Sequence, residues 1–406
     1  MIESKLSILC FGHLPKHIGG RQYTGLATVV WNLANEFNKL DSGNKILLAS
    51  TDIYVDKTKI EATEIIGWTK KTLIKYCIQS PWNFIQLFSY ALSLSFNYRY
   101  PLINTLGKLV FFDYTMKSLS DDVTIINSHD ITNSLIINHL SALYKKKLVV
   151  TIHGIFGNDA NIKNWKINRK IEQKISSSPT ISYITFISSL IKEEWSGLYD
   201  GPIAPSQVIL NCADTNFFHY IPALQVDTSS NISLVTIGSI SDRKGQKRVL
   251  DAICLLPREI RLKLKYSVIG NGTNQDIIEL KNIAKENNLS FEYLGYLEPS
   301  QILSQLHTSD YMILPSSSEG FGLVYLESIA CGTPVIIPKN LPIALEENIL
   351  NDKNSILLED FSSNSIRNCL LEIKKSSYSR KEISETLSKL SWNNIALQYL
   401  NLYQRL

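Results

Sequence analysis

The chain has 406 residues, which is too long for one ordinary hydrophobic core and indicates two domains of about 200 residues each. Hydrophobic residues make up 44% and charged residues 19% of the chain, a globular composition that excludes a largely disordered protein. The formal net charge is only +4, so the composition gives no argument for a nucleic-acid partner. Six scattered cysteines without a CxxC pair indicate reduced thiols in a cytosolic compartment, and the start of the chain, with Glu3 and Lys5, does not read as a signal peptide.

The first half of the chain alternates apolar strands with helices. An apolar run from Leu6 to Phe11 predicts a strand, and the apolar spacing from Leu26 to Phe37 predicts a helix after it. Further strands are predicted at 46–49, 123–127, 147–152 and 180–187, and a further helix at 189–198. Strands that are apolar throughout and joined by helices are typical of a parallel sheet with crossover helices.

The segment between Lys75 and Arg99 contains no charged residue and is long enough to cross a bilayer. Pro81 and Asn83, together with several serines, argue against such a span. Apolar side chains recur there near helical spacing and predict an amphipathic helix, at Trp82, Phe84, Ile85, Phe88, Leu92 and Phe96. Two interpretations stay open for residues 76–98, a helix packed on its own domain and a helix that contacts the inner membrane face.

The second half repeats the alternation of strands and helices. A strand at 234–237 ends at Gly238, and a polar loop at 239–245 leads into a helix. Further strands are predicted at 264–269, 291–294, 311–314 and 334–337, and helices at 247–256, 277–284 and 323–330. The periodicity is interrupted within 211–230, where we expect the linker between two doubly wound α/β domains. Two such domains facing each other place a ligand at the carboxyl ends of both sheets.

The strongest local pattern lies at residues 316–335. Glu319 stands in a small-residue loop after a strand, and Glu327 lies on the helix that follows. Gly320 and Gly322 let the backbone approach a ligand closely, and the N–H groups of the first helical turn can receive a diphosphate. Carboxylates in these places are suited to accept hydrogen bonds from sugar and ribose hydroxyls. On the alternative interpretation Glu319 caps the helix and Glu327 is a surface charge; the complete glycine-flanked pattern favours a ligand site.

This pattern of a glutamate, seven residues and a second glutamate, running into Gly-Thr-Pro-Val at 332–335, resembles the family-4 glycosyltransferases, also described as glycosyl transferases group 1. The resemblance is tight in the second half and loose between about 51 and 122. It implies that Glu319 contacts donor sugar hydroxyls and that Glu327 binds the nucleotide ribose. It further implies that the backbone of Phe321, Gly322 and Leu323 meets the sugar and phosphates.

The resemblance implies an α/β fold of the GT-B type, with two doubly wound Rossmann-like domains facing each other across a cleft. Residues 1–210 would bind the acceptor, and residues 211–390 the nucleotide sugar. Residues 391–406 would form a C-terminal helix that packs back on the N-terminal domain.

A basic pair after the first strand of the second domain is the next family element, because it neutralises the donor diphosphate. Lys244, followed by a glycine, matches the family lysine. The family arginine normally follows the strand-end glycine, Gly238, but this chain has Ser239 there. Arg243 is the candidate to supply that charge from another loop position. The alternative for this loop is a solvated basic turn.

Other positions match the family by their places at strand ends. Gly19 and Gly20 follow the first strand, where the family has a glycine loop against the donor phosphates. His153 resembles the family histidine near the reacting centre. The remaining candidates are His129 and Asp130 on the acceptor side, and Tyr296 and Leu297 in the loop that recognises the nucleotide base.

The function that the resemblance implies is a retaining glycosyltransferase that moves a sugar from a nucleotide-diphosphate donor to a glycan or lipid-linked acceptor. Fixed cations and a helix N-terminus would stabilise the leaving diphosphate, and we find no Asp-x-Asp dyad for a metal and expect no cofactor. We expect a cytoplasmic protein, at the inner membrane face if the acceptor is lipid-linked, in cell-surface polysaccharide or glycolipid synthesis. A nucleotide-sugar epimerase and a degenerate sugar-nucleotide-binding partner subunit stay open as alternatives.

Overall fold

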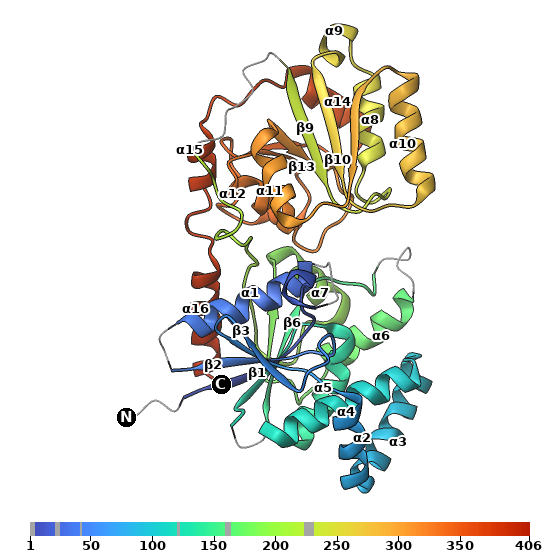
Figure 1. The fold of residues 1–406 in the computed structure, drawn as a ribbon, viewed down its shortest axis with the longest axis vertical. Helices are drawn as coiled ribbons and strands as arrows, with labels where there is room; N and C mark the ends of the chain where they lie inside the picture. The colour runs from blue at the N-terminus through green and yellow to red at the C-terminus, as the bar shows by residue number, and fades with distance from the viewer. Residues whose placement is uncertain (1–4, 21–24, 41–42, 120–121, 159–163, 223–230) are drawn as a thin grey trace. The chain divides into compact units, whose positions relative to one another are not determined.

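The computed structural model describes residues 5–20, 25–40, 43–119, 122–158, 164–222 and 231–406. The chain divides into two compact units, unit 1 with residues 1–211 and 392–406, and unit 2 with residues 212–391. Each unit is built around one sheet with helices packed on it (Figure 1). Part of the segment expected as a linker, 223–230, lies outside the described residues.

Unit 1 contains a sheet of eight strands in the order β3-β4-β2-β1-β5-β6-β7-β8. Its pairings are parallel except for the antiparallel edge pair β3 and β4. All five residues of β1 are buried, as expected of a strand with helices on both faces. The strands are β1 (Ser7–Phe11), β2 (Lys45–Ala49), β3 (Lys57–Ile60), β4 (Thr63–Ile66), β5 (Ile125–Ser128), β6 (Lys147–Ile152), β7 (Tyr183–Phe186) and β8 (Ser206–Val208).

The helices of unit 1 cover its sheet, and the last of them comes from the end of the chain. That helix, α16, packs against α1, and the hydroxyl of its Tyr403 accepts a hydrogen bond of 2.6 Å from the buried Asn127 amide on β5. The helical segments are η1 (Lys16–Ile18), α1 (Gly25–Lys39), α2 (Lys70–Gln79), α3 (Pro81–Tyr98), α4 (Leu102–Leu119), α5 (Ile131–Leu143), α6 (Trp165–Ser176), α7 (Ser189–Tyr199) and α16 (Trp392–Gln404).

The amphipathic helix expected around residues 82–96 is α3. It packs with α2 and α4 beside α5 (Figure 1). Its buried side is formed by Leu87, Ala91 and Leu94, whereas most of the apolar stripe read from the sequence lies on the exposed side. Within the part of the chain that the structure describes, every helix is too short or too polar to cross a bilayer.

Unit 2 contains a six-stranded sheet in the order β11-β10-β9-β12-β13-β14, and all of its pairings are parallel. A hydrophobic cluster lies between this sheet and helices α8, α10 and α14, and further fully buried side chains come from α11, α12 and α13. The strands are β9 (Ile232–Ile237), β10 (Leu264–Ile269), β11 (Ser290–Gly295), β12 (Tyr311–Ile313), β13 (Val335–Pro338) and β14 (Ser355–Leu358). The helices are α8 (Gln246–Cys254), α9 (Arg258–Arg261), α10 (Asn274–Glu286), α11 (Pro299–Thr308), α12 (Leu323–Ala330), α13 (Pro342–Leu345), α14 (Ser363–Glu372) and α15 (Arg380–Glu385).

Each sheet has a switch point, where the chain stops adding strands on one side and begins on the other. In unit 1 this point lies between the neighbouring strands β1 and β5, and in unit 2 between β9 and β12. In open α/β sheets, ligands bind outside the carboxyl ends of the strands at such a point. The loops that follow these four strands are therefore the places where the fold favours a site.

Candidate active site

In unit 2 an ion pair joins the two loops at the switch point. Lys244, in the loop after β9, places its Nζ 2.5 Å from Oε1 of Glu319, in the loop after β12. The same Oε1 accepts a hydrogen bond of 2.5 Å from the hydroxyl of Ser316. Both charged side chains are largely buried, at 12% exposed for Lys244 and 9% for Glu319. Burial lowers the pKa of Lys244, and the charge of Glu319 opposes that shift.

Arg243 reaches the same loop from the position before Lys244. Its Nη1 donates a hydrogen bond of 2.7 Å to the carbonyl of Ser318 and lies 3.6 Å from Oε2 of Glu319. The backbone amide of Ser317 donates to the carbonyl of Arg243 over 2.8 Å, so the two loops are also held main chain to main chain. Arg243 is therefore placed beside the ion pair even though the position after Gly238 holds a serine.

Gln246 supports this loop and is not part of any motif read from the sequence. It is fully buried at the start of α8, and its Nε2 donates to the carbonyl of Ser239 over 3.1 Å. Its Oε1 accepts from the amide of Ser241 over 3.3 Å. The side chain thereby closes the turn between β9 and α8 and fixes the backbone on which Lys244 stands.

Glycines let these loops approach one another. Gly245 has φ +80, and a Cβ there would lie 2.8 Å from the carbonyl oxygen of Pro315. Gly322 has φ +87 and is the N-cap of α12, where a Cβ would lie 2.6 Å from the ring of Tyr325. These positions favour glycine because both the backbone conformation and the space exclude a side chain. Gly320, Phe321 and Leu323 belong to the same turn at the start of α12, where backbone N–H groups can receive an anion.

Glu327 lies in the second turn of α12, partly exposed. Burial raises the pKa of its carboxyl to about 7, with a further rise from the charge of Asp214. Among the described residues, no hydrogen bond or ion pair of the Glu327 carboxylate is found. A carboxylate with free acceptor oxygens can take two hydroxyl donors at once.

The last residues of the motif stabilise the carboxyl end of α12. Gly332, with φ +79, ends α12, and the hydroxyl of Ser328 donates to the carbonyl of Thr333 over 2.8 Å. Arg380, from α15, donates to Oγ1 of Thr333 over 2.6 Å and to the carbonyl of Ser309 over 2.5 Å. These bonds hold the carboxyl end of α12 in place, and no sequence pattern indicated the role of Arg380.

Tyr296 and Leu297 follow β11 at the edge of the unit 2 sheet, two strands from β9. Tyr296 is 40% exposed. The loop after β10 lies between them and the ion pair, and the amide of Gly270 in that loop donates to the carbonyl of Gly295 over 2.8 Å. This places a large exposed ring along the same end of the sheet as Lys244.

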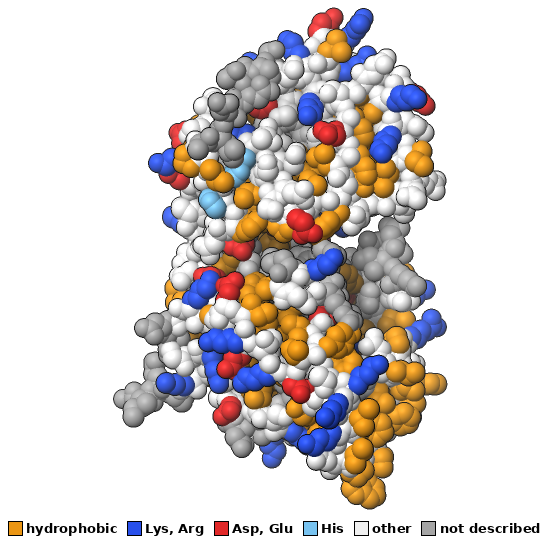
Figure 2. Space-filling model, in the orientation of Figure 1, with side chains coloured by type: hydrophobic (Ala, Val, Ile, Leu, Met, Phe, Trp, Pro, Cys, Tyr) orange, Lys and Arg blue, Asp and Glu red, His pale blue; other side chains and the backbone are white. Residues whose placement is uncertain are grey.

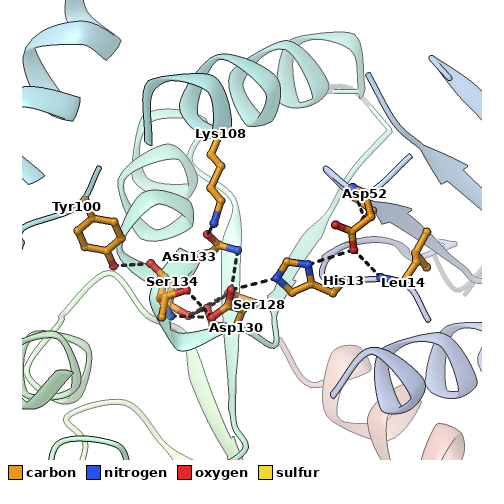
Figure 3. A network of polar contacts seen from close by, with 11 residues as sticks. His13, Leu14, Asp52, Tyr100, Lys108, Ser128, Asp130, Asn133 and Ser134 are labelled. Carbon is orange, nitrogen blue, oxygen red and sulfur yellow. Dashed lines mark hydrogen bonds and ion pairs between the residues drawn. The ribbon is translucent and has the colours of Figure 1, made fainter. Parts of the chain in front are cut away.

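In unit 1 a charged network lies at the switch point (Figure 3). His13 follows β1, and its Nδ1 lies 3.1 Å from Oδ2 of Asp52, in the loop after β2. Its Nε2 lies 3.7 Å from Oδ2 of Asp130, which follows β5. The carboxylates of Asp130 and then Asp52 raise the pKa of His13 to about 9, so the ring is charged at neutral pH. His13 and Asp52 belong to no motif and were missed in the sequence.

Asp130 is also the N-cap of α5. Its Oδ1 accepts from the backbone amide and the hydroxyl of Thr132, and its Oδ2 accepts from Nδ2 of Asn133 over 2.8 Å. Lys108 donates to the side-chain oxygen of Asn133 over 2.7 Å (Figure 3). Burial works to raise the pKa of Asp130, but the hydrogen bonds from His13 and Thr132 hold it below its usual value. Asp130 therefore stays charged, with its oxygens largely occupied.

His129 and His153 form a second pair, between the loops after β5 and β6. Nδ1 of His129 lies 3.0 Å from Nε2 of His153. Burial lowers the pKa of His129 well below its usual value and that of His153 to about 4, so both rings are neutral at pH 7. His129 is only 2% exposed, and its Nε2 is buried without a partner among the described residues.

The unpartnered Nε2 favours one tautomer of His129. A buried N–H without an acceptor is rarer in proteins than an under-used acceptor, so the proton belongs on Nδ1, which donates to His153. His153 then carries its own proton on Nδ1, and that nitrogen is the one left to meet a ligand. The pair would therefore offer a hydrogen-bond donor, not a base.

The two glycines expected near the donor phosphates lie in a turn after β1. Gly19 has φ +85, and a Cβ there would have open space around it. Gly20 is buried against Leu14, whose carbonyl oxygen would lie 2.0 Å from an added Cβ. The packing of the turn therefore requires a glycine at position 20. At position 19 the backbone lies open at the surface of the turn.

The proposed residues fall into two groups, one at each switch point. Arg243, Lys244, Glu319 and the start of α12 come together in unit 2, and His129, Asp130 and His153 come together in unit 1 with His13. Every contact described here lies within one unit.

Comparison with known proteins bears on the family and the fold of the chain. Residues 223–389 match the family model described as "Glycosyl transferases group 1". A protein of Methanocaldococcus jannaschii named as an uncharacterized glycosyltransferase is 26% identical over 283 residues, which are 66% of this chain and 72% of that protein. The O-antigen biosynthesis glycosyltransferase WclY of Escherichia coli is 32% identical over 149 residues, 36% of this chain and 40% of that protein.

The fold is also that of solved structures. HepE of Anabaena, in complex with UDP and glucose, superposes with a TM-score of 0.67 at 16% identity, over 99% of this chain and all of that one. The chain therefore has the GT-B fold, with two Rossmann-like parallel-sheet units, and its C-terminal unit carries the sequence signature of a group 1 glycosyltransferase.

Proposed function

We propose that the chain is a retaining glycosyltransferase that takes its sugar from a nucleoside diphosphate and needs no metal ion. The observation that carries the proposal is the buried ion pair of Lys244 and Glu319 at the switch point of unit 2. A buried cation next to a helix N-terminus is suited to a diphosphate, and a fixed carboxylate beside it is suited to sugar hydroxyls.

Each residue then has its own task. Lys244 and Arg243 neutralise the diphosphate as the bond to the sugar breaks, with the backbone amides at the start of α12 as further donors. Glu319 accepts hydroxyls of the sugar, and Glu327 accepts those of the ribose. The anomeric configuration of the sugar is retained if the acceptor attacks on the face that the diphosphate leaves. The acceptor proton then passes to the leaving phosphate. No step requires a covalent intermediate on the protein.

The donor is best found by binding. A nucleotide sugar that binds the folded chain raises its melting temperature by mass action, and a concentration of 100 times Kd stabilises it by about 2.7 kcal/mol. We expect one of the common nucleoside-diphosphate sugars to raise the melting temperature of the wild type. The same sugar should not raise the melting temperature of Lys244→Ala. If no sugar nucleotide shifts the wild type, the proposal fails.

Transfer and its metal requirement need a separate measurement. With the donor identified, we expect sugar transfer to continue in excess chelator, because the fixed cations do the work of a metal. Complete loss of activity that manganese or magnesium restores would contradict the metal-free mechanism. A new nucleotide sugar formed without any acceptor would show an epimerase instead. Donor binding without any hydrolysis or transfer would show a degenerate binding subunit, which the serine at position 239 keeps as an alternative.

For the acceptor we propose a glycan or a lipid-linked saccharide in cell-surface polysaccharide or glycolipid synthesis. The support is the relative WclY, which is named for O-antigen biosynthesis. We place the chain in the cytoplasm, with access to the inner membrane face. Transfer onto lipid-linked oligosaccharide, compared with the free oligosaccharide, tests this choice.

A further inference from the structure

Helices α2, α3 and α4 of unit 1 expose many large apolar side chains. Trp82 is 78% exposed, Phe96 90% and Ile103 88%. We call the whole group the α3 surface, and it consists of Ile74, Ile78, Trp82, Ile85, Phe88, Leu92, Phe96 and Ile103. Figure 2 shows these helices covered by a continuous area of hydrophobic side chains at the lower right. Monomeric proteins rarely leave such an area uncovered.

The packing of α3 does not explain this apolar surface. The helix already buries one face, through Leu87, Ala91 and Leu94. Its opposite face, at Trp82, Ile85, Leu92 and Phe96, should be polar in a helix that meets only water. The fold of unit 1 therefore does not account for the apolar side chains on the exposed face of α3.

The exposed charges on helices α2, α3 and α4 have one sign, and the nearest exposed carboxylate, Asp56, accepts hydrogen bonds from Thr69 and Thr72 at the start of α2. Lys70, Lys71, Lys75 and Arg99 are exposed, and none of them takes part in the ion pairs found among the described residues of unit 1. The one acidic side chain between residues 70 and 119, Asp113, is buried, and its Oδ1 accepts a hydrogen bond from a tyrosine. Lysine and arginine side chains also appear beside the apolar area in Figure 2.

The exposed apolar side chains and the basic side chains beside them together indicate the kind of partner. Two copies of the α3 surface would bring four unpaired cations against four others, so a symmetric dimer is disfavoured by repulsion. A nucleic acid would leave the apolar side chains in water. An anionic lipid bilayer accepts both, because apolar side chains enter between the headgroups and the cations meet the negative surface.

We propose that the α3 surface docks unit 1 on an anionic lipid bilayer. Helix α3 lies in the plane of the headgroups, with Trp82 near its first turn and Phe96 near its last as apolar anchors. Lys70, Lys71 and Lys75 lie on the neighbouring helix α2, next to Ile74 and Ile78 on its exposed side. This docking goes beyond the proposed sugar transfer and does not depend on it, since it can be measured without donor or acceptor.

Flotation of the full chain with vesicles tests the proposal. We expect the chain to float with vesicles of phosphatidylcholine and phosphatidylglycerol, and to stay behind with phosphatidylcholine alone. Raising the salt concentration to about 1 M, where the Debye length falls to about 3 Å, should weaken flotation. Trp82→Ser with Phe96→Ser should lower the bound fraction at least tenfold, and Lys71→Glu with Lys75→Glu should do the same.

Matched substitutions on unit 2 provide the controls. Leu262→Ser with Ile278→Ser removes two exposed apolar side chains, and Lys263→Glu with Lys285→Glu reverses two exposed charges. Both should float as the wild type does. Far-ultraviolet circular dichroism and melting temperature confirm that each variant is folded, which is expected because all substituted side chains are exposed.

Three outcomes would overturn the proposal. The wild type could fail to bind anionic vesicles, or the variants of the α3 surface could bind as well as the controls. A dimer in solution, lost in Trp82→Ser with Phe96→Ser while vesicle binding is absent, would show that a second copy covers the surface. Donor binding and transfer by the docking variants with a soluble acceptor should remain unchanged, so a failure of docking is distinguishable from a failure of the proposed enzyme.

Discussion

Lys244 and Glu319 are two opposite charges that the fold holds largely out of water. Burying an isolated charge costs desolvation free energy, and here the attraction between the two charges offsets that cost. The hydroxyl of Ser316 and the guanidinium of Arg243 add further polar contacts to the carboxylate. A diphosphate can thus meet a lysine already in position, so little reorganisation is needed during transfer.

Removal of Lys244 should therefore impair transfer much more than folding. We expect Lys244→Ala to lower kcat by about 100-fold or more, the size seen when one fixed donor to a developing negative charge is removed. Lys247→Ala is the control, because Lys247 is half exposed and pairs with Asp251 on the outer side of α8. Steady-state kinetics at saturating donor measure both. Equal kcat in the two variants would refute the role of Lys244.

Glu327 provides a prediction for pH. Its pKa of about 7 means that the charged carboxylate, which accepts ribose hydroxyls, is the minor form at pH 6 and the major form at pH 8. Donor affinity should therefore rise by about tenfold over this range and level off above it. Calorimetric titration at several pH values measures the effect. Glu327→Gln should bind donor weakly and with no such dependence; a rise with pH that survives this substitution would assign it to another group.

The same carboxyl affects stability in the opposite direction. Because its pKa in the folded chain lies above its ordinary value, the folded chain holds a proton that the unfolded chain has lost between about pH 4.5 and 7. The contribution of Glu327 to stability therefore falls as pH rises through this window. Glu327→Gln should raise the melting temperature above pH 7 in the absence of donor, which separates its effect on binding from damage to the fold.

At the scale of elements, the motif at 316–335 combines two different functions. Its first part, from Ser316 to Gly322, holds the polar groups beside the switch point. Its last part, Gly332 and Thr333, is engaged in packing with Arg380 at the other end of α12. Helix α12 thus has one end that is free to meet a ligand and one end that is fixed to the protein.

The N-cap of α12 can be tested by adding one methyl group. Gly322→Ala forces a left-handed φ on an alanine and places its Cβ against the ring of Tyr325, which should destabilise the chain by about 1–3 kcal/mol. Gly197→Ala is the matched control, because Gly197 lies inside α7 with open space around an added Cβ. The control should be neutral or more stable by about 0.4–1 kcal/mol. Urea unfolding compares them, and equal stabilities would contradict the cap.

Much of the regular structure could be predicted from apolar runs alone. Strand β6, strand β10 and helix α12 have the bounds expected from the sequence, because buried parallel strands are continuously apolar and α12 ends at a glycine. The strands β3 and β4 were missed. β3 reads Lys-Thr-Lys-Ile at the sheet edge, where exposure removes the apolar signal. For α3 the helix was predicted, but periodicity does not tell which apolar face is covered.

The candidate site was predictable only where a motif marks it. Lys244 and Glu319 are 75 residues apart; the family pattern assigned both to the donor site, but their ion pair was not predicted. Asp52 and His13 have no such pattern; only the order of the strands brings the loops after β1 and β2 together. Gln246 and Arg380 were likewise missed, since a buried polar side chain that supports a turn looks like any other polar residue in a sequence.

At the scale of the whole molecule, the chain returns to unit 1 at its end. Helix α16 buries Tyr399 and Tyr403, whose hydroxyls lie against the polar side chains of the central strands. Asn127 on β5 donates to Tyr403, and Thr151 on β6 lies 3.3 Å from the hydroxyl of Tyr399. The Asn127 amide donates to a group of α16, whereas Thr151 also bonds to Asn127 and Thr185 within the sheet.

The return of α16 gives a prediction about how the chain folds. Tyr403→Phe leaves the amide of Asn127 without this acceptor in a buried place, which should destabilise unit 1 by about 1–3 kcal/mol. Removal of residues 392–406 also exposes the apolar side of α1, so we expect unit 1 to become sensitive to protease while residues 212–391 stay resistant. Leu397→Ser, at an exposed position of the same helix, should behave as the wild type. Limited proteolysis with mass spectrometry identifies the fragments. A truncated chain in which unit 1 is as resistant as in the wild type would show that α16 is an accessory to this fold and not a part of its core.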